Sequence, residues 1–426
     1  MQPVSESDKE TLSKFKALLA TNLPAEFIED FKPASSPPLL QAHVGSASDV
    51  DLHFIISTCS GAGTAEDFFG QVLNPLTAIL GLEEGRDFLV HRTRSEDSIT
   101  ELTRHILLPR ANAGHAQSVV LLSGDGGMID IVNEVHKGSR SNDFVQPSIV
   151  VLPFGTGNAL ANSNNCKDDT MGLSTLFKGK HTNLSSMRAS LSTGARLVTN
   201  EGRDEQPLGA KEGVPEVFGA VVCSWGLHAS LVGDSDTAEY RKFGAERFQM
   251  AAKALLSPED GSEPHAYKGS VSFRAPGKDK WTAIDRTTHG YVLATLVSDL
   301  EKGFTISPAS IRGSGKMMLI EIPPLATDEI MQVMMAAYDK GKHVGRQNVG
   351  YHEIDGLKIE FHEDDGRWRR VCIDGKIIKV EKGGSLLVEK VASDQTALHI
   401  VVGRPADGDR DHSSTSTVSG KVFTLR

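Results

Sequence analysis

The sequence predicts an α/β + β fold, in which an open α/β domain is followed by a mainly antiparallel β domain. A chain of 426 residues is longer than one hydrophobic core usually spans, so we expect two domains. In the first half, continuous apolar runs end in glycine-rich loops that precede helical stretches, which is typical of a parallel sheet buried on both faces. In the second half, Asp-Gly turns separate short runs of alternating polarity, which is typical of antiparallel hairpins.

The domain boundaries follow from local composition. We expect an N-terminal extension and linker over residues 1–48, which several prolines interrupt. The α/β domain is predicted over 49–200, and a polar segment rich in structure breakers separates it from a β domain at 205–402. Residues 403–426 are polar and rich in Ser, Thr and Asp, so we expect a flexible tail.

Three loops of the first domain are rich in small residues and follow apolar runs directly. Glycines let a backbone approach phosphate oxygens closely, and consecutive amides can bind an anion. Because open parallel sheets bind ligands at the carboxyl ends of their strands, we expect the three loops to lie together and cradle phosphate. Any one loop alone is equally consistent with an ordinary turn. Their small residues are Ser60, Gly61 and Gly63, then Ser123, Gly124 and Gly126, then Gly155, Thr156 and Gly157.

Asp125 lies inside the second of these loops. A carboxylate is unexpected in a site that only binds phosphate, because like charges repel. Its position favours a catalytic role, either as a general base for an acceptor hydroxyl or beside Mg²⁺. The alternative is that Asp125 only forms the turn.

The second domain is predicted from its turns. Asp-Gly or Gly-Gly pairs at 365–366, 374–375 and 383–384 separate runs of strand-like sequence, which predicts a β meander. One helix is expected over 328–340, with Thr327 as its N-cap.

Composition excludes several classes of protein. The net charge of −10 argues against a general nucleic-acid binder, whose surface is normally basic. The four cysteines, at 59, 166, 223 and 372, lack zinc-ligand spacing, and no signal peptide is recognisable, so we expect a reduced, cytoplasmic setting. No apolar run approaches the length of a membrane span.

Segments in a fixed order resemble the diacylglycerol kinase catalytic domain superfamily, and sphingosine kinases most closely. Residues 123–133 read Ser-Gly-Asp-Gly-Gly-Met-Ile-Asp-Ile-Val-Asn, and residues 153–161 read Pro-Phe-Gly-Thr-Gly-Asn-Ala-Leu-Ala. The later segments that complete the order are 224–226, 234–248, 338–343 and 371–375. The resemblance covers about residues 50–390, and the ordered set is more specific than any one segment.

The resemblance implies a lipid kinase with ATP and Mg²⁺ as cofactors and an active site between a nucleotide-binding first domain and a lipid-binding second domain. The reaction would transfer the γ-phosphoryl group to the hydroxyl of a sphingoid base. Ceramide or diacylglycerol is the alternative acceptor. A catalytically weak regulator that binds lipid or nucleotide is a further alternative, because four positions depart from the family pattern, namely Ser57, Thr58, Gly127 and Lys376.

The resemblance also implies roles for individual residues. Asp125 would be the general base, and Arg241 and Arg247 would neutralise phosphate charge, since the chain has no P-loop lysine. Asp130 stands where the family has a nucleotide-contacting Glu. The full nucleotide-binding set would be Ser60, Gly61, Gly63, Thr93, Ser123, Gly124, Gly126, Asp130, Gly155, Thr156, Gly157, Arg241, Arg247 and Asp374.

The lipid head group would be bound by Asp234, or by Ser230 because two extra residues precede Asp234. A carboxylate about 4 Å from the ammonium of a sphingoid base gains roughly 4 kcal/mol of Coulomb energy at an effective dielectric near 20, before desolvation. The alternative is that Asp234 caps a helix. The methionines of the helix at 328–340 could line an acyl-chain channel or pack in the core.

Membrane contact is expected to be peripheral and reversible, because the substrate is a lipid and the chain has no spanning segment. No nucleic-acid partner is expected. Arg367, Arg369 and Arg370 are interpreted as the solvated face of a strand, in preference to a contact with anionic lipid.

Overall fold

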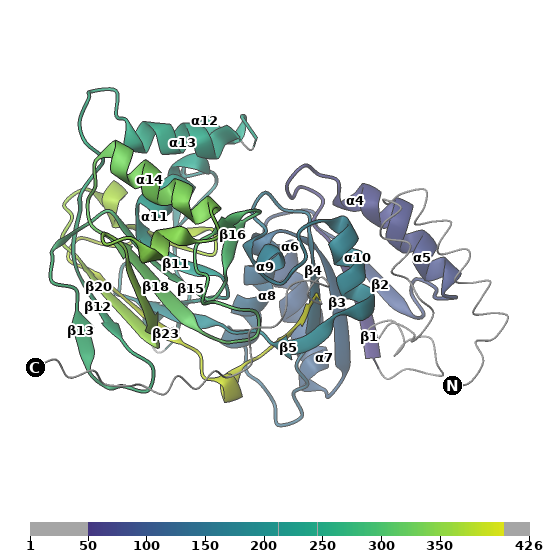
Figure 1. Ribbon diagram of the computed structural model, residues 1–426. Coiled ribbons are helices and arrows are strands. Elements are labelled where there is room, and N and C mark those ends of the chain that lie inside the picture. Colours follow the sequence, from purple (N-terminus) through teal and green to yellow (C-terminus); the bar gives the residue numbers. More distant parts are fainter. Residues whose placement is uncertain (1–49, 212, 245, 404–426) are drawn as a thin grey trace, which may run out of the picture.

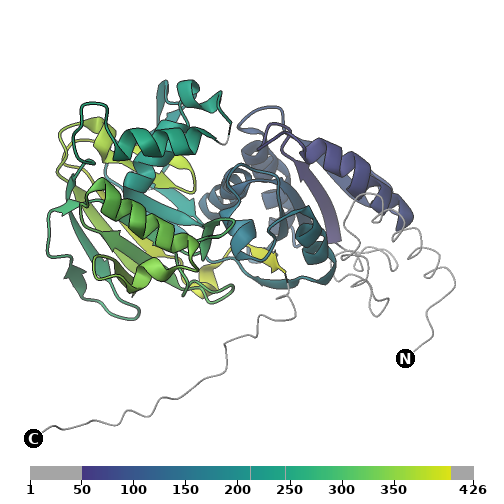
Figure 2. The same ribbon diagram turned by 45° about the horizontal axis from the view of Figure 1, so that its top comes forward.

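The computed structural model describes residues 50–211, 213–244 and 246–403. The predicted extension at 1–48 and the predicted tail beyond Gly403 lie outside these residues. The predicted fold class is confirmed, because an α/β domain is followed by a domain of mainly antiparallel strands (Figure 1). Figure 2 shows the same two parts side by side after a turn of 45°.

The first domain is a six-stranded sheet surrounded by helices. Its strands are parallel from β2 to β24, and only the edge strand β5 runs antiparallel to its neighbour. The central strands β3 and β4 are almost wholly buried, which explains their continuous apolar sequence. Across the sheet the strands are β2 (Phe88–Arg92), β1 (Val50–Ile56), β3 (Ala116–Ser123), β4 (Ser148–Pro153), β24 (His399–Val402) and β5 (Lys180–Asn183).

The helices of this domain include two with a wide π-helical turn. Each wide turn lies just before a proline, Pro75 or Pro109, which has no N–H to complete the regular ladder. The helices are α4 (Ala65–Phe68), η1 (Phe69–Leu73), α5 (Asn74–Ile79), α6 (Ser98–Leu102), η2 (Thr103–Leu107), α7 (Leu108–Asn112), α8 (Asp125–Lys137), α9 (Ala159–Ser163) and α10 (Asp169–Lys178).

The second domain consists of two antiparallel sheets that share a core. Trp225 of one sheet packs against Tyr267 and Phe361 of the other, with ring centroids 5.9 and 5.4 Å apart. One sheet contains β13 (Trp281–Ala283), β12 (Tyr267–Arg274), β20 (Gly356–Phe361), β23 (Ser385–Lys390), β6 (Met187–Leu191), β10 (Val214–Gly219) and β9 (Ala210–Lys211), with β14 (Thr288–His289) beside β12. The other contains β19 (Gly350–Ile354), β18 (Met317–Ile322), β15 (Tyr291–Thr295), β11 (Val222–Gly226), β21 (Arg370–Ile373), β22 (Lys376–Lys379), β7 (Arg196–Thr199) and β8 (Asp204–Pro207).

The predicted β meander is divided between these two sheets. β20 pairs with β23, whereas β21 and β22 form a hairpin in the opposite sheet at the predicted turn 374–375. The predicted turn at 365–366 instead begins a 3₁₀ turn, η4 (Gly366–Arg369), which carries the chain from one sheet to the other. Alternating polarity cannot predict which of the two sheets a strand joins, because both sheets bury one face in the shared core.

Four helices gather at one end of the second domain (Figures 1 and 2). They are α11 (Leu227–Ser235), α12 (Ala238–Arg241), α13 (Glu246–Leu256) and α14 (Thr327–Tyr338). The helix predicted over 328–340 is α14, but the cap prediction is wrong: Thr327 is its first residue, and the Thr327 hydroxyl donates to the carbonyl of Leu256 at 2.5 Å. Within the described residues, no helix is long and apolar enough to cross a membrane.

The structure divides the chain at different points from those predicted. β6 and β7 already belong to the second domain, and β24 returns to the first sheet, where it inserts between β4 and β5. Buried and partly exposed residues alternate in β6, which suits a sheet with one face on a core, unlike the wholly buried β3. The chain therefore crosses between the domains after β5 and again before β24.

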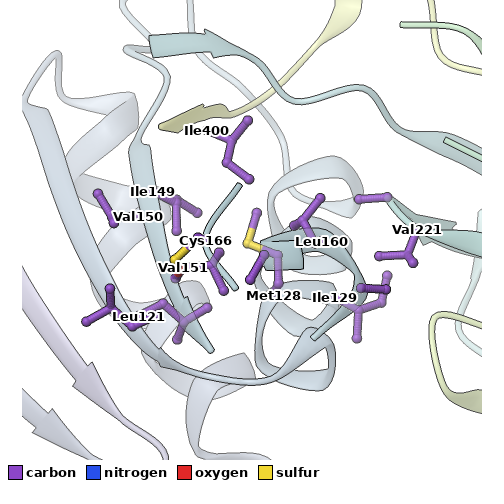
Figure 3. Close-up of a cluster of buried hydrophobic side chains, with 14 of the residues drawn as sticks. Leu121, Met128, Ile129, Ile149, Val150, Val151, Leu160, Cys166, Val221 and Ile400 are labelled. Carbon is purple, nitrogen blue, oxygen red and sulfur yellow. Dashed lines mark hydrogen bonds between the residues drawn. The ribbon is translucent and has the colours of Figure 1, made fainter. Parts of the chain in front are cut away.

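The two domains share a continuous hydrophobic core. Figure 3 shows Met128 and Ile129 of α8 beside Leu160 of α9, with Val221 of the second domain close by. Asn133, further along α8, donates to the carbonyl of Phe218 at 2.8 Å and accepts from its N–H at 3.1 Å. Helix α8, which begins at Asp125, is thereby held against the second domain.

Candidate active site

The three glycine-rich loops meet at the carboxyl edge of the parallel sheet, as predicted. A side chain at Gly61 would lie 2.6 Å from the carbonyl oxygen of Phe154, and one at Gly124 would lie 2.8 Å from the Cα of Gly155. These approaches are possible only without a Cβ, so the glycines let the loops touch. Among the predicted phosphate-binding residues of these loops, those that stay exposed are Gly61, Gly63, Gly126, Thr156 and Gly157.

Asp125 links two of the loops. Its N–H donates to the carbonyl of Gly157 at 3.1 Å. Its carboxylate accepts from the N–H groups of Ala159 and Leu160 at 2.8 and 3.0 Å, which are the first two amides of α9. Burial raises the pKa of Asp125, and these two amides lower it. The Asp125 residue is half-buried, and its neighbour Gly126 is exposed at the edge of the loops.

Asn158 is a site residue that sequence reasoning missed. Its side-chain oxygen accepts from the N–H of Gly155 at 2.9 Å, and its side-chain nitrogen donates to the carbonyl of Gly155 at 2.7 Å. This pair of bonds closes the loop around the exposed Thr156 and Gly157. The available signal was an asparagine between Gly-Thr-Gly and a helix, a position where Asn often bonds nearby backbone.

The other predicted residues of the first domain lie around these loops. Thr93 follows β2, and its hydroxyl accepts from the N–H of Thr58 at 3.0 Å, while Thr58 donates to its carbonyl at 3.0 Å. Thr58, a departure from the family pattern, therefore joins the first loop to the end of β2. Ser123 is the buried last residue of β3. The carbonyl of Ser60 accepts from the N–H of Gly63 at 2.9 Å, which forms a turn.

Asp374 lies in the β21–β22 turn, in a left-handed conformation with φ of 47°. Its carboxylate is buried and accepts hydrogen bonds from the consecutive amides of Ala220, Val221 and Val222, the closest two at 2.5 and 2.6 Å. Burial raises its pKa to about 7, these amides oppose the rise, and the charge of Asp125 contributes to it. Asp374 therefore lies near Asp125 but is enclosed by its own domain.

Asp130 and Lys376 form an ion pair between the domains. The Lys376 ammonium lies 2.7 Å from the Asp130 carboxylate, and both side chains are more than two-thirds buried. Burial raises the pKa of Asp130, and Lys376 lowers it. The lysine that departs from the family pattern thus meets the aspartate that replaces the family's glutamate.

Arg241 and Arg247 lie on α12 and α13 and face Asp236. Arg241 donates to both oxygens of Asp236 at 3.1 Å, and Arg247 lies 3.8 Å from the same carboxylate. These hydrogen bonds raise the pKa of Arg241, and the charges of Glu201 and Glu96 act in the same direction. Glu96 belongs to the loop after β2, so Arg241 lies at the junction of the domains.

Asp234 is paired with two arginines. Arg367 donates to one oxygen at 2.9 Å, and Arg370 donates to the other at 2.6 Å. The interpretation of a solvated arginine face is therefore wrong for Arg370 and also for Arg369, which is buried and donates to backbone carbonyls. Ser230 is buried as well, and its hydroxyl accepts from Tyr267 at 2.8 Å.

A narrow apolar pocket lies between α11, α13 and α14. Its volume of about 20 Å³ holds roughly one water molecule, which is too small for an acyl chain as it stands. Residues that line it include Leu227, Leu255, Leu256, Leu325 and Ile330. The α14 methionines were expected either to line an acyl-chain channel or to pack in the core. Met331 and Met335 do neither, because both are exposed on the surface.

A resident metal centre is not evident from side chains alone. Within the described residues, no three or more His, Cys, Asp or Glu side chains are placed to hold one ion. Mg²⁺ bound with a nucleotide needs fewer protein ligands, since it typically takes one or two carboxylates together with phosphate oxygens and waters.

The chain is similar in sequence to known lipid kinases. Residues 51–189 match the diacylglycerol kinase catalytic domain family. Sphingosine kinase 1 of Homo sapiens is 23% identical over 362 residues, which cover 77% of this chain and 86% of that protein. Sphingosine kinase 1 of Rattus norvegicus is 23% identical over 322 residues, covering 68% and 76%.

The fold is also similar to that of solved structures. A candidate diacylglycerol kinase from Bacillus anthracis str. Sterne superimposes with a TM-score of 0.52 at 10% identity, over 83% of this chain and 97% of that one. The matched domain contains all three glycine-rich loops and Asp125. The prediction of an ATP-dependent lipid kinase with a diacylglycerol kinase catalytic domain, similar to sphingosine kinases, is therefore confirmed for this chain.

Proposed function

We propose that the chain transfers the γ-phosphoryl group of ATP to the hydroxyl of a sphingoid base, with Asp125 as the general base. The observation that carries the proposal is the Asp125 carboxylate, which two amides of α9 orient beside exposed glycine loops. A carboxylate has about four acceptor positions and uses two here, so it can still accept a hydroxyl proton. General-base catalysis typically contributes ~10²–10⁴-fold.

The nucleotide phosphates are proposed to lie over the exposed glycine loops, where backbone amides can reach them. Arg247 supports this, because its Nε is buried without a partner in the described structure and would gain one from a phosphate. Mg²⁺ bound with ATP would offset phosphate charge. The remaining members of the proposed nucleotide site are Ser60, Thr93, Ser123, Gly124, Asp130 and Arg241. Asp374, which is buried, is proposed to contribute only by fixing the β21–β22 turn.

The sphingoid base is proposed from the similarity to sphingosine kinases. Asp234 stays the better head-group candidate, because Ser230 is closed off by Tyr267. An ammonium would have to replace one of the two arginines on Asp234. Arg367, 49% exposed, can leave more easily than Arg370, 14% exposed, so the net attraction is smaller than for a free carboxylate.

Peripheral membrane contact is proposed at the end of the second domain where α12, α13 and α14 gather (Figure 1). Phe243, Met250, Met331 and Met335 are exposed there, and exposed apolar side chains of this kind favour insertion into a lipid surface. The apolar pocket lies between α11, α13 and α14, so a lipid could pass from the membrane to the pocket if α13 and α14 separate.

A lipid panel with radiolabelled ATP tests the proposal. The purified chain is given a sphingoid base, ceramide or diacylglycerol at equal mole fraction in the same micelles. We expect the sphingoid base to be phosphorylated fastest. Faster transfer to ceramide or diacylglycerol would contradict the substrate, and ATP binding without transfer to any lipid would favour the regulator.

A further inference from the structure

Helix α9 carries the two amides that orient Asp125, yet it has only five residues. A helix of this length is not stable by itself, so contacts with the rest of the protein must fix its position. It packs on α8 and β4 of its own domain. It also contacts β16 (Asp299–Glu301) of the second domain, which forms a hairpin with β17 (Phe304–Thr305).

Ser163, the last residue of α9, makes the polar part of this contact. Its hydroxyl donates to the carbonyl of Asp299 at 3.1 Å and accepts from the N–H of Asp299 at 2.9 Å. The Asp299 carboxylate accepts from the hydroxyls of Ser298 and Thr305, both at 2.6 Å, which ties β16 to β17. Ser163 is buried, so water does not replace these bonds easily.

The outer side of the hairpin is attached to α14. The rings of Phe304 and Tyr338 lie 4.9 Å apart, and the Tyr338 hydroxyl donates to the carboxylate of Glu301. Figure 1 shows β16 between α14 and α9. The hairpin thus connects the helix that exposes Met331 and Met335 with the helix that holds Asp125.

We propose that the β16–β17 hairpin is a positioning element for Asp125, and that Ser163 is the residue through which it acts on α9. The inference rests on the proposed role of Asp125 as the general base. The hairpin touches neither the glycine loops nor Asp125 through any hydrogen bond that we observe in the described residues. Its effect is to hold the far end of a short helix whose first turn orients the carboxylate.

The protonation of Asp125 provides a readout. Burial raises the pKa of Asp125, and the α9 amides lower it. If α9 loosens, the amides lower the pKa less, so the pKa of Asp125 rises. The adjoining loop and α9, residues 153–163, carry no ionisable side chain. The β21–β22 turn contributes Asp374, which interacts with the charge of Asp125. Asp374 is held by amides 220–222, which α9 does not carry.

The test compares Ser163→Ala with Ser192→Ala. Ser192 makes the same two bonds with Ser385, donating to its carbonyl at 3.3 Å and accepting from its N–H at 2.9 Å, but within the second domain. For Ser163→Ala we expect kcat to fall about three- to tenfold, because one or two hydrogen bonds are lost. ATP affinity should stay unchanged. We also expect the acid limb of kcat/KM to move to higher pH. Ser163→Thr, which keeps the hydroxyl, should restore both.

Asp125→Asn is measured in the same series to separate the two proposals. If Asp125→Asn is inactive but Ser163→Ala behaves like Ser192→Ala in kcat and in its pH profile, the hairpin inference alone is overturned. If Asp125→Asn stays active, the proposed function and the inference fail together. Should Ser163→Ala not fold, Tyr338→Phe on the surface replaces it: a smaller shift in the same direction supports the inference, and an unshifted acid limb overturns it.

Discussion

Asp125 and Asp374 are two aspartates at the junction of the domains, and consecutive backbone amides bind both carboxylates. Asp125 accepts two such bonds and remains partly exposed beside the glycine loops. Asp374 accepts hydrogen bonds from three amides, so that each of its two oxygens has two contacts. It is only 5% exposed. Backbone amides therefore bind both carboxylates, but one aspartate is enclosed and the other is partly exposed.

The difference lies in the acceptor capacity that remains. Four contacts from three amides surround the Asp374 carboxylate, which is buried, so a substrate hydroxyl has no open approach to it. Asp125 keeps about half of its positions. We infer that Asp374 fixes the β21–β22 turn beside β10 and β11, while Asp125 is free for chemistry. The predictions below test this contrast, from the largest expected effect to the smallest.

Asp374→Ala should destabilise the protein strongly, because three buried amides lose their acceptor. Each unsatisfied buried group costs about 1–3 kcal/mol, so we expect a loss of about 3 kcal/mol or more in the free energy of unfolding. Urea denaturation measures it, with Asp364→Ala as the control, since Asp364 is an exposed aspartate paired with Lys382. Equal stability of the two variants would show that Asp374 is not a structural group.

The pH dependence of stability should distinguish the wild type from Asp374→Asn. The folded-state pKa of Asp374 is about 7, above its ordinary value of 3.8, so the native state holds a proton that the unfolded state has released. Its contribution is fully present below about pH 4 and is lost as pH rises through 7. We expect the urea midpoint of the wild type to fall more than that of Asp374→Asn between pH 5 and 8. Parallel curves would contradict the raised pKa.

Lys376→Met should have a smaller effect, because it leaves the Asp130 carboxylate without its partner across the domain junction. We expect a loss of about 1 kcal/mol in the free energy of unfolding. Lys379→Met is the matched control, since Lys379 lies on the same strand and pairs with Glu205 at the surface. If both variants lose the same amount, the Asp130–Lys376 pair does not help to join the domains.

Replacing Met331 and Met335 by Ser should weaken membrane association by only a few-fold, since each buries one side chain in the lipid surface. Cosedimentation with vesicles that contain sphingoid base measures the effect. Leu89→Ser is the control, because Leu89 is similarly exposed on β2 of the other domain. An equal loss for Leu89→Ser would contradict the proposed membrane-facing end.

Local patterns in the sequence were sufficient for the elements that local chemistry decides. The glycine loops could be predicted because only glycine allows the approach of Gly124 to Gly155, and the turn at 374–375 because Asp-Gly favours left-handed backbone. The position of Asp125 inside such a loop gave its proposed role without the structure.

Contacts between distant segments could not be predicted in this way. Asp234 meets Arg367 and Arg370 more than 130 positions later in the chain, and no local pattern pairs them. The same holds for β24, whose four residues return to the first sheet after the whole second domain. A single sequence shows which residues are apolar or charged, but a short strand fits any open sheet edge, so its partner stays open.

The most direct test of the account is single-turnover transfer of radiolabelled phosphate from ATP to a sphingoid base by Asp125→Asn. Asp168→Asn is the matched control, because Asp168 also accepts from a helix amide, that of Met171 at 2.8 Å, but it caps α10 instead of α9. We predict that Asp125→Asn loses ~10²–10⁴-fold in rate while binding ATP within a few-fold of wild type, and that Asp168→Asn keeps its rate. Turnover by Asp125→Asn close to that of Asp168→Asn would show that Asp125 only forms the turn.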